Sequence, residues 1–428
     1  MRIAIITAGA GGMYCGSCMK DNALAVALGH IGHEAVLVPT YTPITTDEPN
    51  VSRPRVFLGG VNVYLQNLGA VFRHLPGVIE RGLNTTPLLR WAGGFVGKTD
   101  YTKLGPLTIS MLSGRHGKQR KEIAKLAAWL KDEIQPDVVV MTNALLSGCV
   151  PVLQDALNVP IWTTLQGDDV FLDAIFWRHK EPCLEWIRKN DAATAGYLVT
   201  SSHYADHMAY FTKLDRAKMH IVPIGLNPRG HLGLQPRPVD RPPTLGYFAR
   251  FDPVKGFHNA VTAYLELKKQ PELRGLKFRF GGWQAKKYER YTTMQVSRMY
   301  DAGHREDVEL VPCPDLGSKA RFFQSIDVLS TPVEYLEPKG LYVLEAWANG
   351  VPVVQPNRGN FPELLERTGG GVLYEYGATD SQVSQLASLL TDLPRAAELG
   401  RRGHAGLHEH FTAVRMAEET LAVLTTPR

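Results

Sequence analysis

Two groups of charged side chains in the second half of the sequence have the types and spacing of a binding site for a phosphate-bearing, hydroxyl-rich ligand. Two glutamates, Glu337 and Glu345, lie eight positions apart. A pair of cations, Arg250 and Lys255, precedes them in the same half of the chain. Lys and Arg neutralise phosphate oxygens, whereas a carboxylate accepts hydrogen bonds from neighbouring hydroxyls. The combination predicts a site for a nucleotide sugar.

The glutamates are expected on either side of a helix N-terminus. An apolar strand should end before Glu337, and a helix should begin near 338–340, which places Glu345 in its second turn. Gly340 and Leu341 would then offer backbone N–H groups that attract an anion together with the helix dipole. A single glutamate is usually a solvated surface residue. Glu345, however, has apolar neighbours on nearly every side and therefore needs a partner or a ligand.

The cations are expected at a loop that follows a strand. Arg250 comes just after an apolar run and Lys255 just before a helical pattern. Side chains at the carboxyl ends of parallel strands point into the crevice where open α/β sheets bind ligands. There they would neutralise a diphosphate leaving group without a metal. Alone the pair is weak evidence, because such cations are mostly solvated and Arg250 has Asp252 as an alternative partner.

The pattern of the whole chain predicts the elements that hold these residues. Short apolar runs alternate with longer runs of 3.6-residue period, which is typical of parallel sheets covered by helices on both faces, the α/β class. The predicted strands are 3–8, 34–39, 61–65, 137–141, 160–165, 197–201 and 220–224 in the first half, and 244–249, 277–282, 308–312, 327–331, 352–356 and 371–375 in the second.

These runs predict two α/β domains in tandem. A Pro-, Gly- and Arg-rich stretch without apolar periodicity, 226–243, is expected to be the linker between domains 1–225 and 244–404. Apolar residues at helical spacing predict a C-terminal helix in 405–428. The region 42–120 is the hardest to assign, and either a mobile loop or an insertion on the acceptor side would fit it.

The composition is that of an ordinary globular protein. Hydrophobic residues make up 44% and charged residues 21% of the 428 residues, which excludes a disordered chain, a coiled coil and a polytopic membrane protein. A formal net charge of +5 is too small and too dispersed to indicate a nucleic-acid partner.

Features of the N-terminal region and the cysteine count bear on localisation. The five cysteines are an odd number, unlike a disulfide framework, which favours a reducing compartment. The apolar run 3–10 is only about as long as a strand, and no stretch reaches the roughly 18 apolar residues that span a bilayer. We therefore expect a cytoplasmic protein whose membrane contact, if any, is peripheral.

Three weaker signals point to other chemistry. Cys15 and Cys18 form a CxxC motif without a second pair or a nearby histidine cluster, so metal or redox chemistry has little support. Asp168 and Asp169 are adjacent, and such neighbours usually point apart, so no metal site is expected. The glycine-rich turn 9–14 suggests a dinucleotide oxidoreductase, but it lacks the third glycine of G-x-G-x-x-G.

The motifs together resemble a known family. The loop R-F-D-P-V-K-G at 250–256, the Glu337-x7-Glu345 segment and A-N-G-V-P-V-V resemble the retaining glycosyltransferases of family 4, which have the GT-B fold, and the resemblance covers most of the chain. The early segment 57–65 also resembles glycogen and starch synthases. The resemblance implies two Rossmann-like, doubly wound parallel-sheet domains facing each other across a deep cleft, with a C-terminal helix packing back toward the first domain.

The resemblance also implies roles for single residues, all of them in binding or activating the donor. Arg250 and Lys255 would bind the diphosphate, Glu345 the ribose and Glu337 a hydroxyl of the donor sugar. Further donor contacts would come from the backbone amides of Gly340 and Leu341 and from Gly11, Gly12 and Gly281.

Two departures concern the opposite side of the site. Asn143 stands near the position where many members of the family carry a histidine, and Gln166 and Asp168 stand where a later histidine often follows. We expect Asn143, Gln166 and Asp168 to form the acceptor or donor-sugar face, since they follow predicted strands. Gly281 is followed directly by Gly282, where the family has a looser Gly-x-Gly.

The expected activity is retaining, metal-independent transfer of a sugar from a nucleoside diphosphate sugar to the hydroxyl of a glycan or small-molecule acceptor, with no cofactor. A UDP-sugar is expected first, with ADP- and GDP-sugars as alternatives. A nucleotide-sugar epimerase and a glycan phosphorylase on the same fold remain rival hypotheses, as does a catalytically silent nucleotide-sugar-binding protein.

Overall fold

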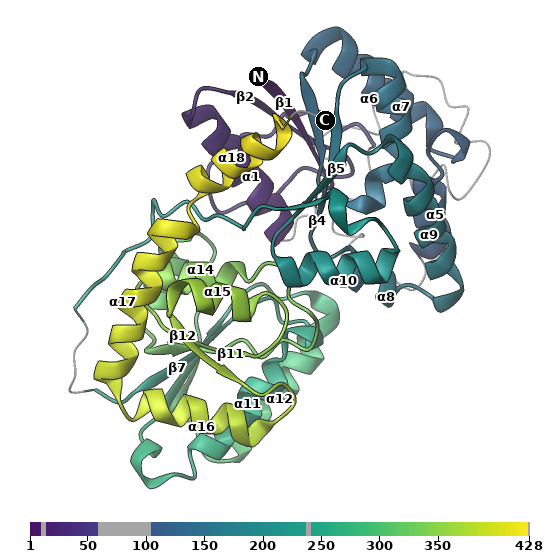
Figure 1. Ribbon diagram of the computed structural model, residues 1–428. Coiled ribbons are helices and arrows are strands. Elements are labelled where there is room, and N and C mark those ends of the chain that lie inside the picture. Colours follow the sequence, from purple (N-terminus) through teal and green to yellow (C-terminus); the bar gives the residue numbers. More distant parts are fainter. Residues whose placement is uncertain (10–13, 59–103, 237–240, 427–428) are drawn as a thin grey trace. The chain divides into compact units, whose positions relative to one another are not determined.

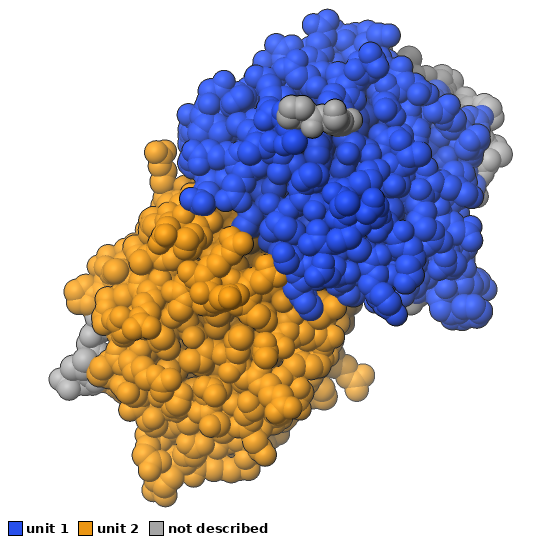
Figure 2. Space-filling view, in the orientation of Figure 1, with its two compact units in different colours: residues 1–223, 413–428 blue, residues 224–412 orange. Residues whose placement is uncertain are grey.

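The computed structural model describes residues 1–9, 14–58, 104–236 and 241–426 (Figure 1). The chain forms two compact units (Figure 2), of which unit 1 comprises Met1–Pro223 and Ala413–Arg428, and unit 2 comprises Ile224–Thr412. Each unit contains one six-stranded parallel sheet. The predicted α/β class with two doubly wound parallel sheets is confirmed. The predicted strand 61–65 lies outside the described residues.

The sheet of unit 1 has the strand order β2-β1-β3-β4-β5-β6. Its strands are nearly continuous runs of buried apolar residues, as expected where helices cover both faces of a parallel sheet. After β1 the chain forms β2 on one side of β1 and then β3 on the other side, so the strand order reverses between β1 and β3. Open α/β sheets bind ligands at this switch point. The strands are β1 (Arg2–Thr7), β2 (Glu34–Pro39), β3 (Val138–Met141), β4 (Ile161–Leu165), β5 (Gly196–Val199) and β6 (Met219–Ile221).

Helices of unit 1 include one from the far end of the sequence. Side chains of α18 are buried in one cluster with side chains of α1 and of strands β1 and β3. Among the described helices of the chain, none is both long and apolar enough to cross a membrane. The helices of unit 1 are α1 (Gly16–His30), α5 (Gly105–Leu112), α6 (Arg120–Trp129), α7 (Val150–Leu157), α8 (Asp168–Ala174), α9 (Trp177–Asn190), α10 (Ser202–Thr212) and α18 (Ala413–Leu424).

The sheet of unit 2 has the order β12-β11-β10-β7-β8-β9. The chain fills one side of β7 with β8 and β9 and then places β10 on the other side, so the switch point lies between β7 and β10. Its strands are β7 (Thr244–Phe248), β8 (Lys277–Gly281), β9 (Val308–Leu310), β10 (Val328–Leu329), β11 (Val353–Pro356) and β12 (Gly371–Tyr374).

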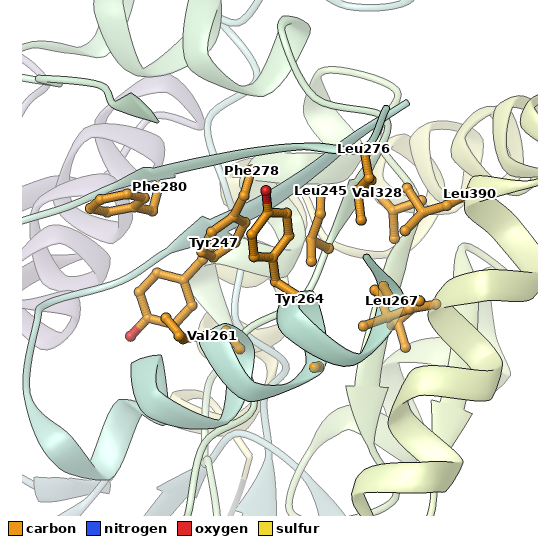
Figure 3. Close-up of a cluster of buried hydrophobic side chains, with 14 of the residues drawn as sticks. Leu245, Tyr247, Val261, Tyr264, Leu267, Leu276, Phe278, Phe280, Val328 and Leu390 are labelled. Atoms are coloured by element: carbon orange, nitrogen blue, oxygen red, sulfur yellow. The ribbon is translucent and has the colours of Figure 1, made fainter. Parts of the chain in front are cut away.

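An aromatic core lies on one face of this second sheet (Figure 3). Tyr247, Phe278 and Phe280 project from neighbouring strands and meet Tyr264 of α11, and all four side chains are almost completely buried. Burying one such side chain stabilises a fold by about 1.5–3 kcal/mol. The helices of unit 2 are α11 (Phe257–Leu267), α12 (Glu289–Asp301), α13 (Leu316–Gln324), α14 (Leu341–Ala348), α15 (Phe361–Thr368), α16 (Thr379–Leu390) and α17 (Leu393–His410).

The C-terminal segment 405–428, expected as one helix, contains the end of one helix and the whole of another. Helix α17 ends at His410 and α18 begins at Ala413. Between them the chain is held by pairing with the start of unit 2, where the backbone N–H of Leu226 donates to the carbonyl of Phe411 at 2.8 Å. Unit 2 is therefore one continuous stretch of chain inserted between the two stretches that form unit 1.

Candidate functional site

A closed network of three side chains lies at the switch point of the unit 2 sheet. Lys255 follows β7 and Glu337 lies in the loop after β10, with Nζ and Oε2 2.7 Å apart. The hydroxyl of Tyr335 accepts a hydrogen bond from Lys255 and donates one to Oε2 of Glu337 at 2.5 Å. Only 12% of the lysine side chain and 4% of the glutamate side chain are exposed. Lys255 and Glu337 are thus in direct contact, and Tyr335, which the sequence analysis missed, bonds to both.

The loop after β7 is shaped so that Lys255 reaches this network. The carboxylate of Asp252 caps the short turn Pro253–Lys255 by accepting the N–H of Val254 at 3.4 Å. Gly256 follows with φ of +72°, and a Cβ there would lie 1.8 Å from the carbonyl oxygen of Pro332. Only glycine fits this close approach of two backbones. The Asp252 carboxylate thus caps the turn, and its pairing with Arg250 stays a prediction.

Electrostatics at the network favour an anionic ligand. Burial lowers the pKa of Lys255, and the Glu337 carboxylate opposes this. Burial also disfavours ionisation of Glu337, but the Lys255 and Lys339 cations outweigh it and hold the pKa of that carboxyl at about 2. The charge of Arg250 also acts on Lys255. Three cations, Arg250, Lys255 and Lys339, are thus grouped at the Glu337 carboxylate, so positive charge is available for an anionic ligand.

Helix α14 begins beside this network. Its N-cap residue, Gly340, has φ of +70°, a conformation that glycine adopts without strain, and its carbonyl accepts the N–H of Val343 at 2.8 Å. The preceding N–H, that of Lys339, donates to Oε1 of Glu337 at 3.3 Å. Leu341 is the first helical residue, so the helix begins four positions after Glu337. Anion binding by the amides of Gly340 and Leu341 stays a prediction.

The second glutamate is buried against a lysine. The carboxylate of Glu345, in the second turn of α14, lies 2.5 Å from Nζ of Lys319 on α13, and 4% and 6% of the two side chains are exposed. Glu345 is expected to need a partner or a ligand, and the structure shows that Lys319 is its partner. Sequence reasoning missed Lys319, although it shares one helical face with Phe322 and Phe323, at three and four positions, and both are buried.

Two glycines end β8 at the same edge of the sheet. The carbonyl of Gly281 accepts the N–H of Ala249 at 3.2 Å. Gly282 has φ of +139°, and a Cβ there would lie 1.7 Å from the carbonyl oxygen of Ala249. The glycine pair therefore permits close approach between the segments that follow β7 and β8. A role of Gly281 in donor binding stays a prediction, and Gly11 and Gly12 lie outside the described residues.

In unit 1, the predicted polar residues lie where β3 and β4 end. Both carboxylate oxygens of Asp168 accept backbone N–H groups, one from Ala144 at 2.7 Å and one from Gln166 at 3.0 Å. Burial raises the pKa of Asp168 to about 6, against the opposing effect of these two bonds. The amide of Gln166 donates to the carbonyl of Thr142 at 2.7 Å. Oδ1 of Asn143 is buried and has no hydrogen-bond partner among the described residues.

This cluster extends to side chains that the sequence analysis did not select. The hydroxyl of Thr142 donates to Asp21 of α1 at 2.6 Å. Asp169 accepts a hydrogen bond from the hydroxyl of Tyr204 at 2.6 Å and lies 3.0 Å from Nε2 of His207. The carboxylates of Asp168 and Asp169 thus bind different partners, and within the described part of the chain no three His, Cys, Asp or Glu side chains are grouped to hold a metal ion.

The structure therefore assembles the predicted residues into two clusters. Arg250, Lys255, Glu337, Gly340 and Leu341 gather at one edge of the unit 2 sheet. Asn143, Gln166 and Asp168 gather at the corresponding edge of the unit 1 sheet, where Asp168 and Gln166 hold the loops that follow β3 and β4. Their roles toward substrates stay predictions.

Residues 235–405 match the family model described as glycosyl transferases group 1. The chain is 26% identical over 216 residues to a D-inositol 3-phosphate glycosyltransferase of Segniliparus rotundus, covering 47% of this chain and 46% of that protein. It is 36% identical over 93 residues to the alpha-maltose-1-phosphate synthase of Mycolicibacterium smegmatis, covering 20% and 24%. The chain thus spans at most about half the length of these curated relatives.

Similar solved structures extend over the whole chain. The sucrose-phosphate synthase of Thermosynechococcus elongatus superposes with a TM-score of 0.71 at 17% identity, covering 99% of this chain and 98% of that one. The Anabaena protein HepE, solved in complex with UDP and glucose, superposes with a TM-score of 0.67 at 14% identity, covering 99% of each chain. At these identities the likeness establishes the fold, and the expected GT-B fold is confirmed.

Proposed function

Because residues 235–405 form a glycosyl transferases group 1 domain, we propose that the protein transfers a sugar from a nucleoside diphosphate sugar to the hydroxyl of an acceptor. The observation that carries the proposal is the buried Lys255–Tyr335–Glu337 network beside the N-terminus of α14. It joins a cationic group, a carboxylate and helix amides at a switch point, where α/β sheets bind ligands.

We propose that the phosphates of the donor bind at this positively charged group. Arg250 and Lys255 would contact the diphosphate. The backbone N–H groups of Gly340 and Leu341 would donate hydrogen bonds to one phosphate, because a helix N-terminus favours an anion. Charge develops on the diphosphate as the bond to the sugar breaks, so fixed cations at that position stabilise the transition state. On this proposal, neither a metal nor a cofactor takes part.

The two glutamates would hold the sugar portions of the donor. Glu337 is kept ionised by Lys255 and Lys339, so it can accept a hydrogen bond from a hydroxyl of the donor sugar. Glu345 would accept hydrogen bonds from the ribose. The acceptor hydroxyl would lose its proton to the leaving phosphate, and the product would retain the anomeric configuration of the donor. A UDP-sugar is the first candidate, since HepE was solved with UDP-glucose.

Nucleotide binding tests the donor site. Calorimetric titration with UDP, GDP and ADP should find one nucleotide that binds the native protein. Glu345→Gln should weaken its affinity by about tenfold or more, since a hydrogen bond to a charged group contributes about 1.5–3 kcal/mol. Glu272→Gln is the matched control, because Glu272 is exposed and precedes β8, away from the carboxyl ends of the strands. Unchanged affinity in Glu345→Gln would remove the ribose role.

Turnover tests the reaction itself. With the sugar donor of the nucleotide that binds, Arg250→Ala and Lys255→Ala should lower kcat by orders of magnitude, and an effect on KM alone would contradict transition-state stabilisation. Transfer should continue in excess chelator. NMR of the first product should show a retained anomer. An epimerised donor without any acceptor, consumption of inorganic phosphate, or binding without turnover would each favour one of the rival hypotheses.

The polar edge of unit 1 is proposed to face the acceptor or the donor sugar. Asn143 gives the strongest support for this proposal. Its Oδ1 is buried without a hydrogen-bond partner among the described residues, and a ligand hydroxyl could donate to it. Asn143→Ala and Gln166→Ala should raise KM for the acceptor or lower kcat, measured by initial rates. Wild-type acceptor kinetics in both variants and in Asp168→Asn would contradict this assignment.

A further inference from the structure

We infer that Cys15 and Cys18 form a reactive dithiol that is reversibly oxidised to an intramolecular disulfide. The pair lies at the start of α1, next to the carboxyl end of β1 in the unit 1 sheet. The inference concerns the chemistry of these two thiols and does not depend on the proposed transfer reaction.

The position of the pair in the helix brings the two side chains together. Cys15 is the N-cap of α1, in extended conformation, and Cys18 is the third helical residue. In many helices the side chain at each of these two positions bonds to the backbone N–H of the other, an arrangement known as a capping box. Here both positions carry thiols, and Cys15 does not form the side-chain capping bond of that arrangement. The geometry of a helix start thus makes the two thiols neighbours in the first turn.

The two thiols lie within one turn of chain. Cys15 at the N-cap and Cys18 three positions later share the start of α1, and the Cys15 side chain raises the pKa of the Cys18 thiol. Cys15 packs against the same buried cluster that contains Cys18. The hydroxyl of Thr7, the last residue of β1, lies 4.0 Å from the sulfur of Cys18 and fixes its other side. Residues three positions apart at a helix start are neighbours, which suits the Cα spacing of about 4.4–6.8 Å that a disulfide requires.

The two cysteines differ as the two members of a reactive CxxC pair do. Cys15 is partly exposed and sits at the N-terminus of a 15-residue helix, where the helix dipole favours a thiolate. Cys18 is 2% exposed, and its hydrogen bond with Cys15, together with burial, raises its pKa. Cys15 is therefore the residue that attacks an external disulfide, and Cys18 is the one that resolves the product.

The other cysteines provide internal controls. Burial raises the pKa of Cys149 and of Cys183 to about 12, so both thiols stay protonated near neutral pH. Cys313 is partly exposed, as Cys15 is, but burial of its sulfur raises its pKa to about 11. A difference in reactivity between Cys15 and Cys313 therefore reports on the helix N-terminus and the paired thiol, not on exposure alone.

The oxidation requires a low-molecular-weight disulfide as the oxidant. The Cys15 thiolate attacks one of its sulfurs, which releases one small thiolate and leaves a mixed disulfide on Cys15. Cys18 then loses its proton to solvent and attacks the sulfur of Cys15, which releases the second small thiolate. The protein loses two protons and two electrons, and the small disulfide takes them up and becomes two thiols.

The test is a redox titration of the full chain. The protein is equilibrated with mixtures of reduced and oxidised glutathione, quenched with acid, alkylated and mapped by mass spectrometry. The expected result is that Cys15 and Cys18 lose alkylation together, in one transition, and that their common peptide becomes lighter by two hydrogens. If both remain fully alkylated at every ratio, or if only mixed and intermolecular disulfides form, the inference is overturned.

Single variants distinguish the two roles. Cys18→Ser should accumulate a glutathione adduct on Cys15, whereas Cys15→Ser should leave Cys18 alkylated at every ratio. Cys313→Ser is the matched control and should titrate as the wild type does. Oxidation of Cys18 in Cys15→Ser would contradict the assignment. Because the wild-type titration alone decides whether the disulfide forms, the inference stays testable even where a variant folds poorly.

Discussion

Replacing Lys319 by methionine tests whether the buried lysine holds Glu345 in place. In the wild type the two charges lie 2.5 Å apart, with 6% and 4% of the side chains exposed. Methionine keeps most of the length and apolar surface of lysine and removes the charge. The variant therefore leaves the Glu345 carboxylate buried without its ion-pair partner on α13.

The size of the expected loss follows from this burial. Removing one partner of a buried ion pair typically costs about 3–5 kcal/mol, because the remaining charge stays desolvated. For a unit of the size of Ile224–Thr412, each kcal/mol corresponds to roughly 2–4 °C in Tm. Unit 2 of Lys319→Met should therefore melt about 6–20 °C lower. The double variant Lys319→Met/Glu345→Gln should regain most of that loss, since a neutral amide is less costly to bury.

Differential scanning calorimetry with and without the nucleotide that binds is the assay. Lys319→Arg is the matched control, because it retains the positive charge. Two results would contradict this reasoning. One is a Tm of Lys319→Met within 2 °C of the wild type, which corresponds to about 1 kcal/mol or less. The other is a double variant no more stable than the single variant, because the Lys319–Glu345 contact would then not offset burial of the carboxylate.

Three further predictions concern stability. Gly403→Ala should destabilise the protein despite the better helix propensity of alanine, because the new Cβ would lie 2.2 Å from Cδ1 of Trp347. In Gly29→Ala the new Cβ meets no atom within 4 Å, so this variant should be stabilised by about 0.5–1 kcal/mol. Equal Tm shifts in the two variants would contradict this. The pKa of Glu337 is lowered to about 2, so ionisation of Glu337 adds about 3 kcal/mol to the free energy of unfolding above pH 4.5, and this is lost as pH falls toward 2. Urea titrations at several pH values should show no such loss in Glu337→Gln. The pKa of Asp168 is raised to about 6, so ionising it costs stability as pH rises from about 4 to 6, and Asp168→Asn should abolish that decline; a decline of the same size in the variant would contradict it.

The fold was accessible from the sequence because local pattern and tertiary structure agree. Strand β2 has the predicted limits, 34–39, and the predicted run 277–282 differs from β8 by one residue. Such buried parallel strands appear as continuous apolar runs bounded by turn residues, so their positions can be found without knowing their neighbours. The N-terminus of α14 was equally visible, since Gly340 interrupts the chain between a polar loop and an apolar helix.

Partners of the site residues were less accessible. The sequence shows that Glu345 lies among apolar residues, but the identity of its cation depends on how α13 packs beside α14. Tyr335 lies two positions from Glu337, and nothing in its spacing indicates a bond to Lys255, 80 positions earlier. Contacts between distant segments are set by strand order and helix packing, which periodicity does not encode.

The insertion of unit 2 into unit 1 has a consequence for synthesis of the chain on the ribosome. Unit 1 begins first, but its helix α18 is made last, after all 189 residues of Ile224–Thr412. At about 5–20 residues per second, that delay is roughly 10–40 s. Until then the α1 surface that receives Met416 and Ala417 is uncovered. Unit 1, which starts first, is therefore completed last, and its α1 surface stays uncovered while unit 2 is translated.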